Sequence, residues 1–248
     1  MATTGVMRPG HIQLRVLDLD ESVEFYKNVL GLVETGRDAA GRVYFKAWDE
    51  RDHNSVVLRQ ADRAGMDLIG FKVKDKATLE QLDKDLQAYG VATERIPAGE
   101  LLETGERVRF TIPTGHVLEL YAEKTDVGNG QPYTNPDPWI PAAEHGIGPH
   151  RFDHCLLYGP NLEENLKLFT EVLGFHLVER VLMEDGKALL ATFISCSHKA
   201  HDLAFGVALQ ASPLFNVADA IGCLNAVLDL GHTVPDALHH VLHMGTHP

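Results

Sequence analysis

The stretch that decides the fold is His11-Ile-Gln-Leu14, followed by Glu21, Phe25-Tyr26 and Val29-Leu30-Gly31, because it returns later in the chain. The second copy reads His154-Cys-Leu-Leu157, then Glu164, Leu168-Phe169 and Val172-Leu173-Gly174. In both copies a His stands twenty residues before the Gly. Each copy has the pattern of a strand, a short turn and an amphipathic helix ended by Gly. The chain therefore contains a repeated supersecondary unit that begins with a residue able to ligate a metal.

The repeat continues beyond the helix. Residues 41–45 and 189–193 both read as strands, and eight residues after each of them stands a His, His53 or His201. A degenerate copy lies between them, with a strand over 67–73, a helix capped by Thr78 and ended by Gly90, and two further strands over 107–121. The sequence predicts an α+β fold of tandem β-α-β-β-β units.

The units group into larger regions. Residues 1–125 hold two units and form a first domain, residues 126–150 are a linker rich in Pro, Gly and Asn, and residues 151–205 hold a third unit. After Phe205 the composition changes, because residues 206–248 contain no Lys, Arg or Glu and hold five of the fourteen histidines. We expect one amphipathic helix over 214–228 in this divergent tail, and a C-terminal domain that is incomplete.

The bulk composition excludes several classes of protein. The net charge of −13 repels phosphate backbones and anionic membranes, so nucleic acid is not an expected partner. The three cysteines show no CxxC spacing, which favours reduced thiols in a cytoplasm. The N-terminus has no apolar signal-peptide core, and no apolar run is long enough to span a membrane. A soluble cytoplasmic protein is expected.

Six strings carry a family resemblance. They are GVMRPGHIQLRVLDLDESVEFY, GRVYFKAW, PAGELLETGERVRF, RFDHCLLYG, LFTEVLGF and SHKAHDLAF. Together they span about residues 5–205, and they resemble the type I extradiol dioxygenases of the vicinal oxygen chelate superfamily, in particular the catechol 2,3-dioxygenases. The resemblance ends at Phe205.

The resemblance implies a function for specific residues. Enzymes of this family use Fe(II) and O₂ for extradiol (meta) cleavage of catechol to 2-hydroxymuconic semialdehyde in aromatic catabolism, usually as homotetramers. By resemblance, His154 is the first metal ligand and His201 is the catalytic acid–base residue outside the metal's ligand set. The family's second metal His and its Glu stand in strings similar to LHHVSF and GNRNEVF, and neither string follows Phe205 in its expected place.

Each candidate also has a structural interpretation. From spacing alone, His154 is more often a core histidine, and His201 is more often a surface histidine beside Lys199; only the family strings favour the functional roles. His11 and Glu119 occupy the positions of a His and a carboxylate ligand in the first domain, but no His opens the second unit, so we interpret them as structural partners. His240, in a faint echo of LHHVSF, is a weak candidate for the second metal His.

The sequence therefore predicts a catechol 2,3-dioxygenase-like chain whose own activity is lost with the missing ligands. The tail has the character of a frameshifted or recombined end. The alternatives are a non-catalytic binding module of the same fold and a glyoxalase-like metal enzyme. Because the third unit has no partner unit, we expect open strand edges over 151–158 and 189–195, an apolar surface that only the tail helix can cover, and self-association in place of a regular tetramer.

Overall fold

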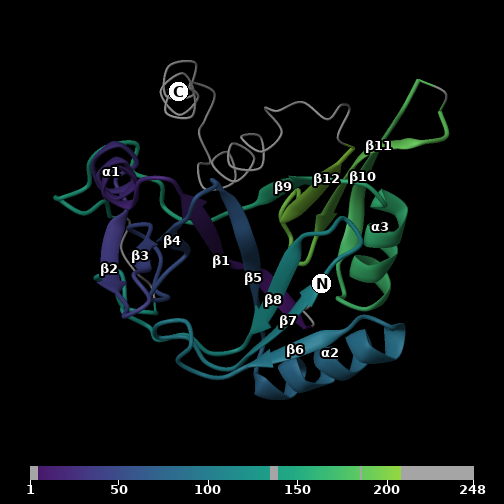
Figure 1. Ribbon diagram of the computed structural model, residues 1–248, viewed down its shortest axis with the longest axis horizontal. Coiled ribbons are helices and arrows are strands. Elements are labelled where there is room, and N and C mark those ends of the chain that lie inside the picture. Colours follow the sequence, from purple (N-terminus) through teal and green to yellow (C-terminus); the bar gives the residue numbers. More distant parts are fainter. Residues whose placement is uncertain (1–4, 135–138, 185, 208–248) are drawn as a thin grey trace.

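The computed structural model describes residues 5–134, 139–184 and 186–207, and within them the β-α-β-β-β pattern occurs three times (Figure 1). The first unit consists of β1 (Val6–Val16), α1 (Leu19–Glu24) continued by a π-helical turn (Phe25–Val29), β2 (Val33–Arg37), β3 (Val43–Lys46) and β4 (Val56–Gln60). The second consists of β5 (Gly65–Val73), α2 (Lys76–Tyr89), β6 (Thr93–Ile96), β7 (Arg107–Thr111) and β8 (Val117–Tyr121). The third consists of β9 (Cys155–Tyr158), α3 (Leu162–Glu171), β10 (His176–Leu182), β11 (Leu189–Ser195) and β12 (Leu203–Gly206). The predicted repeat is confirmed.

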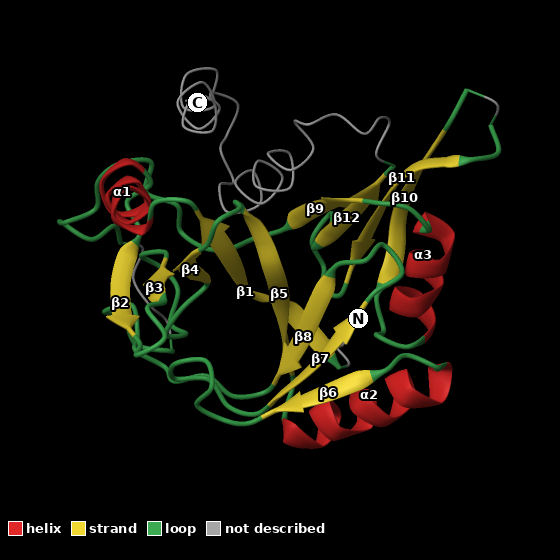
Figure 2. Cartoon of the chain, viewed as in Figure 1, coloured by secondary structure: helices red, strands yellow, loops and turns green. Residues whose placement is uncertain are grey.

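All three units share one topology. In each, the first strand pairs in parallel with the last, which gives the orders β2-β3-β4-β1, β5-β8-β7-β6 and β10-β11-β12-β9. The first two units join through an antiparallel pairing of β1 with β5, so that they form one eight-stranded sheet (Figure 2). The third unit forms a separate four-stranded sheet. The first domain is therefore a pair of units joined at their first strands.

The helix boundaries follow from capping side chains. Asp75, not Thr78, is the N-cap of α2: its carboxylate accepts hydrogen bonds from the backbone N–H and the hydroxyl of Thr78. The expected N-cap, Thr78, was therefore wrong: the helix begins three residues earlier. The Asp75 carboxylate stands just before the helix and accepts a hydrogen bond from a free amide of the first turn, whereas Thr78 already lies within that turn. At the other end, Gly90 adopts a left-handed conformation with φ of 97°, as predicted for the helix end.

The edges of the third unit differ from the expectation. Strand β11 is not an edge strand, because it lies between β10 and β12. The edge strands of this sheet, among the described residues, are β9 and β10. Strand β9 stands in the place that β1 and β5 occupy in their units, and those two strands cover each other's edges by pairing. The prediction of self-association thus rests on β9 and β10 rather than on β11.

The third unit packs against the first domain. One hydrophobic core runs from Val6 to Phe205, and the rings of Phe71 on β5 and Phe175 before β10 lie 5.7 Å apart, edge to face. The side chain of Asn161 donates a hydrogen bond to the carbonyl of Pro113. The first domain therefore covers apolar surface that we expected only the tail to cover. The tail itself, with His240 and the helix expected over 214–228, lies outside the described residues.

Part of the linker is fixed along the first unit. Arg51 donates hydrogen bonds to the side chain of Asn129 and the carbonyl of Gln131, and its guanidinium stacks on the ring of Tyr133 at 3.7 Å. The ring of Trp48 meets that of Trp139 edge to face. In the part of the chain that the structure covers, no helix has the length and apolar character needed to cross a membrane.

We expect residues 5–127, expressed as a fragment, to unfold in a single cooperative transition. The fragment contains the whole eight-stranded sheet and the bridge between Asp52 and Asp126, and single domains below about 150 residues usually behave in this way. Urea unfolding followed by circular dichroism and by tryptophan fluorescence checks this, with coincident curves expected. Separated transitions would contradict the view that the first two units form one domain.

Candidate functional site

The structure brings together the two histidines that the sequence singles out in the third unit. His154 directly precedes β9 and His201 lies two residues before β12; these strands are parallel neighbours, with Cys155 opposite Leu203. The ring centroids of His154 and His201 are 4.6 Å apart and the rings meet edge to face. Phe193 on β11 packs against the other side of His201, at 5.1 Å. Parallel pairing of the first and last strands of the unit is what places the two imidazoles side by side.

The surroundings of His201 suit a group that accepts protons. Burial, followed by the nearby His154 and Lys199, lowers the pKa of His201 below its usual value. Its imidazole is therefore neutral near pH 7 and can act as a base. The neighbouring His198 is exposed, as expected for a solvated residue.

Polar contacts fix the position of His154. Its Nδ1 lies 3.0 Å from a carboxylate oxygen of Asp153, and 28% of its side chain is exposed. The hydrogen bond with His154, together with the charge of Lys199, holds the pKa of Asp153 far below its usual range. Because an ionised carboxylate only accepts hydrogen bonds, Nδ1 of His154 carries the proton of this hydrogen bond.

The described residues do not by themselves provide a complete metal site. They contain no group of three or more His, Cys, Asp or Glu side chains placed to hold an ion. Asp202, the carboxylate nearest in sequence to His201, instead accepts hydrogen bonds from the Ser195 hydroxyl and from the amides of Cys196 and Ser197. The facial triad of non-haem iron oxygenases needs three metal ligands, two His and one carboxylate. The metal-ligating side chains described in this unit therefore do not by themselves fit Fe(II).

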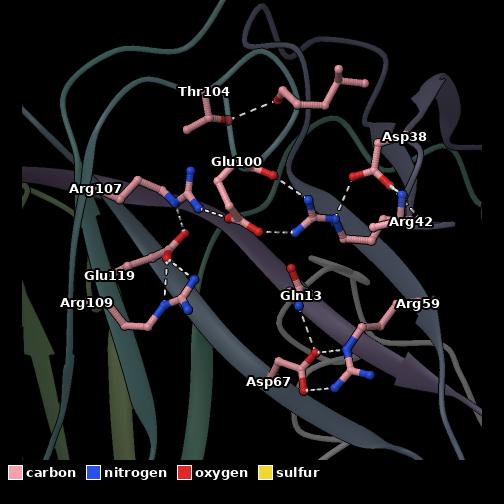
Figure 3. A network of polar contacts seen from close by, with 12 residues as sticks. Gln13, Asp38, Arg42, Arg59, Asp67, Glu100, Thr104, Arg107, Arg109 and Glu119 are labelled. Carbon is pink, nitrogen blue, oxygen red and sulfur yellow. Dashed lines mark hydrogen bonds and ion pairs between the residues drawn. The ribbon is translucent and has the colours of Figure 1, made fainter. Parts of the chain in front are cut away.

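The corresponding position in the first domain holds an ion cluster. Nε2 of His11 lies 2.9 Å from Glu119, and both side chains are fully buried. Figure 3 shows Arg107 and Arg109 on either side of Glu119, with ion-pair distances of 2.9 Å and 3.0 Å. Lys124 donates to Nδ1 of His11 at 3.2 Å. These cations provide the positive charge that a metal ion supplies in a complete site, which supports the interpretation of His11 and Glu119 as structural partners.

A close approach of backbone and ring explains why no second His stands in this domain. Gly70 on β5 lies directly opposite His11 on β1, beside Glu119 on β8. A Cβ atom at position 70 would lie 2.1 Å from the His11 ring. The His11 imidazole therefore occupies the space that a side chain at position 70 would need.

Sequence reasoning missed the three cations of this cluster. Arg107 and Arg109 alternate along β7, so both face one side of the sheet, and Arg109 is in register with Glu119 on β8. This alternation across a predicted hairpin was the available signal. Lys124, three residues after the end of β8, gave no such signal, because only the fold brings it to His11.

The cluster keeps His11 neutral. Burial, and then the charge of Lys124, lower the pKa of His11 to about 4. Burial by itself raises the pKa of Glu119, but the hydrogen bond from His11 and the charges of Arg107 and Arg109 lower it to about 2. A neutral His11 thus accepts from Lys124 at Nδ1 and donates to an ionised Glu119 at Nε2.

We expect the first domain to lose stability as the pH falls from about 7.5 to 5. His11 titrates near 6.5 when unfolded and near 4 when folded, so the unfolded chain binds the extra proton and acidification favours unfolding. The stabilisation is complete above the unfolded pKa and decreases by about 2 kcal/mol at pH 5. Urea unfolding of residues 5–127 across this range measures it, and His11→Asn should reduce the pH dependence. Part of the dependence should remain, because burial lowers the pKa of Lys124 to about 7 and this group also titrates in the range. Equal slopes in the two chains would contradict the assignment.

A cavity of about 760 Å³ lies in the first domain, away from the paired histidines of the third unit. Its lining includes Lys72, Leu102, Glu103 and Lys124. Lys72 and Lys124 are already engaged, with Asp52 and with Asn54 respectively. The cavity thus borders the buried ion cluster and does not extend the site of the third unit.

Two family models match the chain. Residues 66–125 match the catechol 2,3-dioxygenase-like N-terminal domain, and residues 151–246 match the Glyoxalase/Bleomycin resistance protein/Dioxygenase superfamily. The second match continues past Phe205, where the quoted string similarities end, into residues outside the described part. The tail therefore retains similarity at the level of the superfamily.

Individual relatives agree with these matches. The chain is 54% identical over 202 residues to a metapyrocatechase of Pseudomonas sp. (strain CF600), an alignment that covers 81% of this chain and 65% of that relative. It is 26% identical to a manganese-dependent 2,3-dihydroxybiphenyl 1,2-dioxygenase of Geobacillus genomosp. 3, covering 85% of this chain and 67% of the relative. The chain thus spans about two thirds of the length of these curated relatives.

A solved structure shows the same fold. The 2,3-dioxygenase LapB from Pseudomonas sp. KL28 superposes with a TM-score of 0.80 at 66% sequence identity, covering 84% of this chain and 73% of that one. The predicted fold class, paired β-α-β-β-β units of the glyoxalase and vicinal oxygen chelate type, is confirmed.

Proposed function

Because this chain belongs to the catechol 2,3-dioxygenase family of extradiol ring-cleaving enzymes, we propose that residues 151–205 carry one half of a site that cleaves catechol with O₂ to 2-hydroxymuconic semialdehyde. His154 is one ligand of the metal and His201 is the acid–base residue. The observation that supports this most is the edge-to-face pair of His154 and His201, 4.6 Å apart at the start of neighbouring strands.

The chain's own residues perform the proton chemistry in this proposal. The neutral imidazole of His201 accepts a proton from a hydroxyl group of the bound diol and later returns it to the departing oxygen. The ring of Phe193 packs edge to face against His201 and limits the positions that its imidazole can take. The metal supplies Lewis acidity when bound, with Fe(II) as the family's metal and manganese, named for one relative, as the alternative.

We further propose that this chain does not complete the site. The sequence after Phe205 carries neither of the strings that hold the family's second His and Glu, and one imidazole binds Fe(II) weakly. A recombined end accounts both for the change in composition and for a superfamily match that continues to residue 246, whereas a frameshift would remove that match. The coding DNA beyond codon 205, read in three frames, distinguishes the two explanations. Catechol-type diols and O₂ as partners, a cytoplasmic location and a tetrameric family assembly belong to the same proposal.

A chimera tests whether residues 1–205 retain their half of the site. We expect residues 1–205, fused to the part of the Pseudomonas sp. KL28 relative that follows the residues matched to Phe205, to form the yellow ring-cleavage product from catechol when loaded with Fe(II). His154→Ala should abolish product formation, and His201→Ala should lower kcat by about 10²–10⁴-fold, as for the loss of a general acid–base group. Lys167→Met, an exposed change on α3, is the matched control.

The absorbance of the product gives the rate, and the metal content of each chimera is measured alongside. A folded, metal-loaded chimera that leaves catechol intact would contradict the proposal. Activity that persists in His154→Ala would also overturn it, because the ligand would then lie elsewhere.

A further inference from the structure

A chain of charged side chains connects the strand that carries His154 to the loop that carries His201. The ammonium group of Lys199 lies 2.5 Å from the carbonyl of Asp153, 3.1 Å from its carboxylate, and 2.9 Å from the carboxylate of Asp202. Asp153 in turn contacts Nδ1 of His154 at 3.0 Å. One lysine therefore joins two segments that are 46 residues apart in sequence.

Asp202 fixes the loop end of this connection. The side chain of Asp202 is fully buried, and one of its oxygens accepts hydrogen bonds from the hydroxyls of Ser195 and Ser197 and from the amides of Cys196 and Ser197. The other oxygen pairs with Lys199. Because several donors converge on one buried carboxylate, Asp202 anchors the start of the loop that leads from Ser195 to His201.

The first unit of the same chain is an internal comparison. The residues that correspond to Asp153 and Lys199 by their spacing from the histidines are Gly10 and Arg51. A Cβ atom at Gly10 would lie 2.0 Å from the Tyr121 hydroxyl, so no carboxylate fits there, and Arg51 binds the linker at Asn129. The charged connection is thus present where the histidine remains partly exposed and absent where the histidine is buried in an ion cluster.

We propose that Lys199 and Asp153 are positioning residues that fix the tautomer of His154 and its placement beside His201. Asp153 holds the proton of His154 on Nδ1, so that the lone pair of the neutral ring lies on Nε2, the atom that would bind the metal. Lys199 keeps the Asp153 carboxylate in place. The roles assigned to His154 and His201 rest on the proposed function, whereas the connection itself rests on the contacts above.

Nitrogen-15 magic-angle-spinning NMR of the histidine-labelled full chain at about pH 8 tests the proposal, at a pH where histidines are mostly neutral. The spectrum does not depend on the state of association, and subtraction of the spectrum of His154→Gln isolates the signals of His154. We expect the Nδ1–H form of His154 to exceed the Nε2–H form by about tenfold, as one charge-assisted hydrogen bond allows. Lys199→Met should reduce this ratio several-fold, and Lys199→Arg should restore it. Lys167→Met is the control.

Asp153→Asn provides a second, nearly isosteric variant and should abolish the preference, because an amide can donate as well as accept. A wild-type chain with the proton on Nε2 of His154, or an unchanged ratio in both Lys199→Met and Asp153→Asn, would overturn the proposal. The measurement involves neither metal nor catechol. An inactive chimera with a normal tautomer ratio would therefore contradict the proposed function and leave this inference standing.

Discussion

Replacing Glu119 by Gln lowers the free energy of unfolding of the first domain by about 3–5 kcal/mol, the range expected when one partner of a buried ion pair is removed. Arg107 is fully buried and has its ion pair with Glu119 at 2.9 Å. Arg107 also forms an ion pair with Glu100, whose side chain is partly exposed. Loss of the Glu119 charge leaves the Arg107 cation in a desolvated site without its buried counter-ion.

Urea unfolding of the 5–127 fragment at pH 7.5 measures this effect. Glu94→Gln, an exposed change on β6, is the matched control and should cost less than about 0.5 kcal/mol. Adding Arg107→Met to Glu119→Gln should recover much of the loss, because the uncompensated cation is then removed as well. A cost below about 1 kcal/mol for Glu119→Gln would show that the ion cluster does not stabilise the domain.

The repeat made most of the described fold predictable. Strand and helix periods recur at fixed distances from His11 and His154, and a chain that folds the same unit repeatedly must place equivalent residues at equivalent points. Parallel pairing of first and last strands then brings His201 to His154. The same logic interpreted His11 and Glu119 as structural partners at the equivalent positions of the first domain, and their side chains lie 2.9 Å apart.

Other features depend on contacts that no local pattern reports. The His11 ring fills the space beside Gly70, and this becomes visible only when β1 and β5 pair. Lys199 connects Asp153 to Asp202 across two segments, so its position depends on the whole third unit. The packing of Phe175 on Phe71 joins two domains that the sequence treated as separate. Each of these is a contact between residues far apart along the chain. The periodic spacing of apolar residues predicts helices and strands but not such contacts.

The comparison of the two halves gives the first domain a structural role. Its glutamate is paired with Arg107 and Arg109, and its neutral histidine contacts Lys124, so positive charge already surrounds the position that a metal ion occupies in a complete site. In the third unit the cation Lys199 pairs with Asp153 rather than with His154 itself, and the His154 imidazole stays partly exposed. The chain thus combines a first domain with a buried ion cluster and a third unit that carries the proposed half-site.

Turnover of catechol by the unmodified chain tests this account most directly. The purified full chain is mixed with catechol, Fe(II) and O₂, and the yellow ring-cleavage product is followed by absorbance, with His154→Ala as the matched variant and the active chimera as the positive control. Because the described residues contain no group of three His, Cys, Asp or Glu side chains placed to hold an ion, we expect a rate no higher than that of His154→Ala and of free Fe(II). Rapid formation of yellow product by the full chain, lost in His154→Ala, would contradict the account, since the missing ligands would then come from the chain itself.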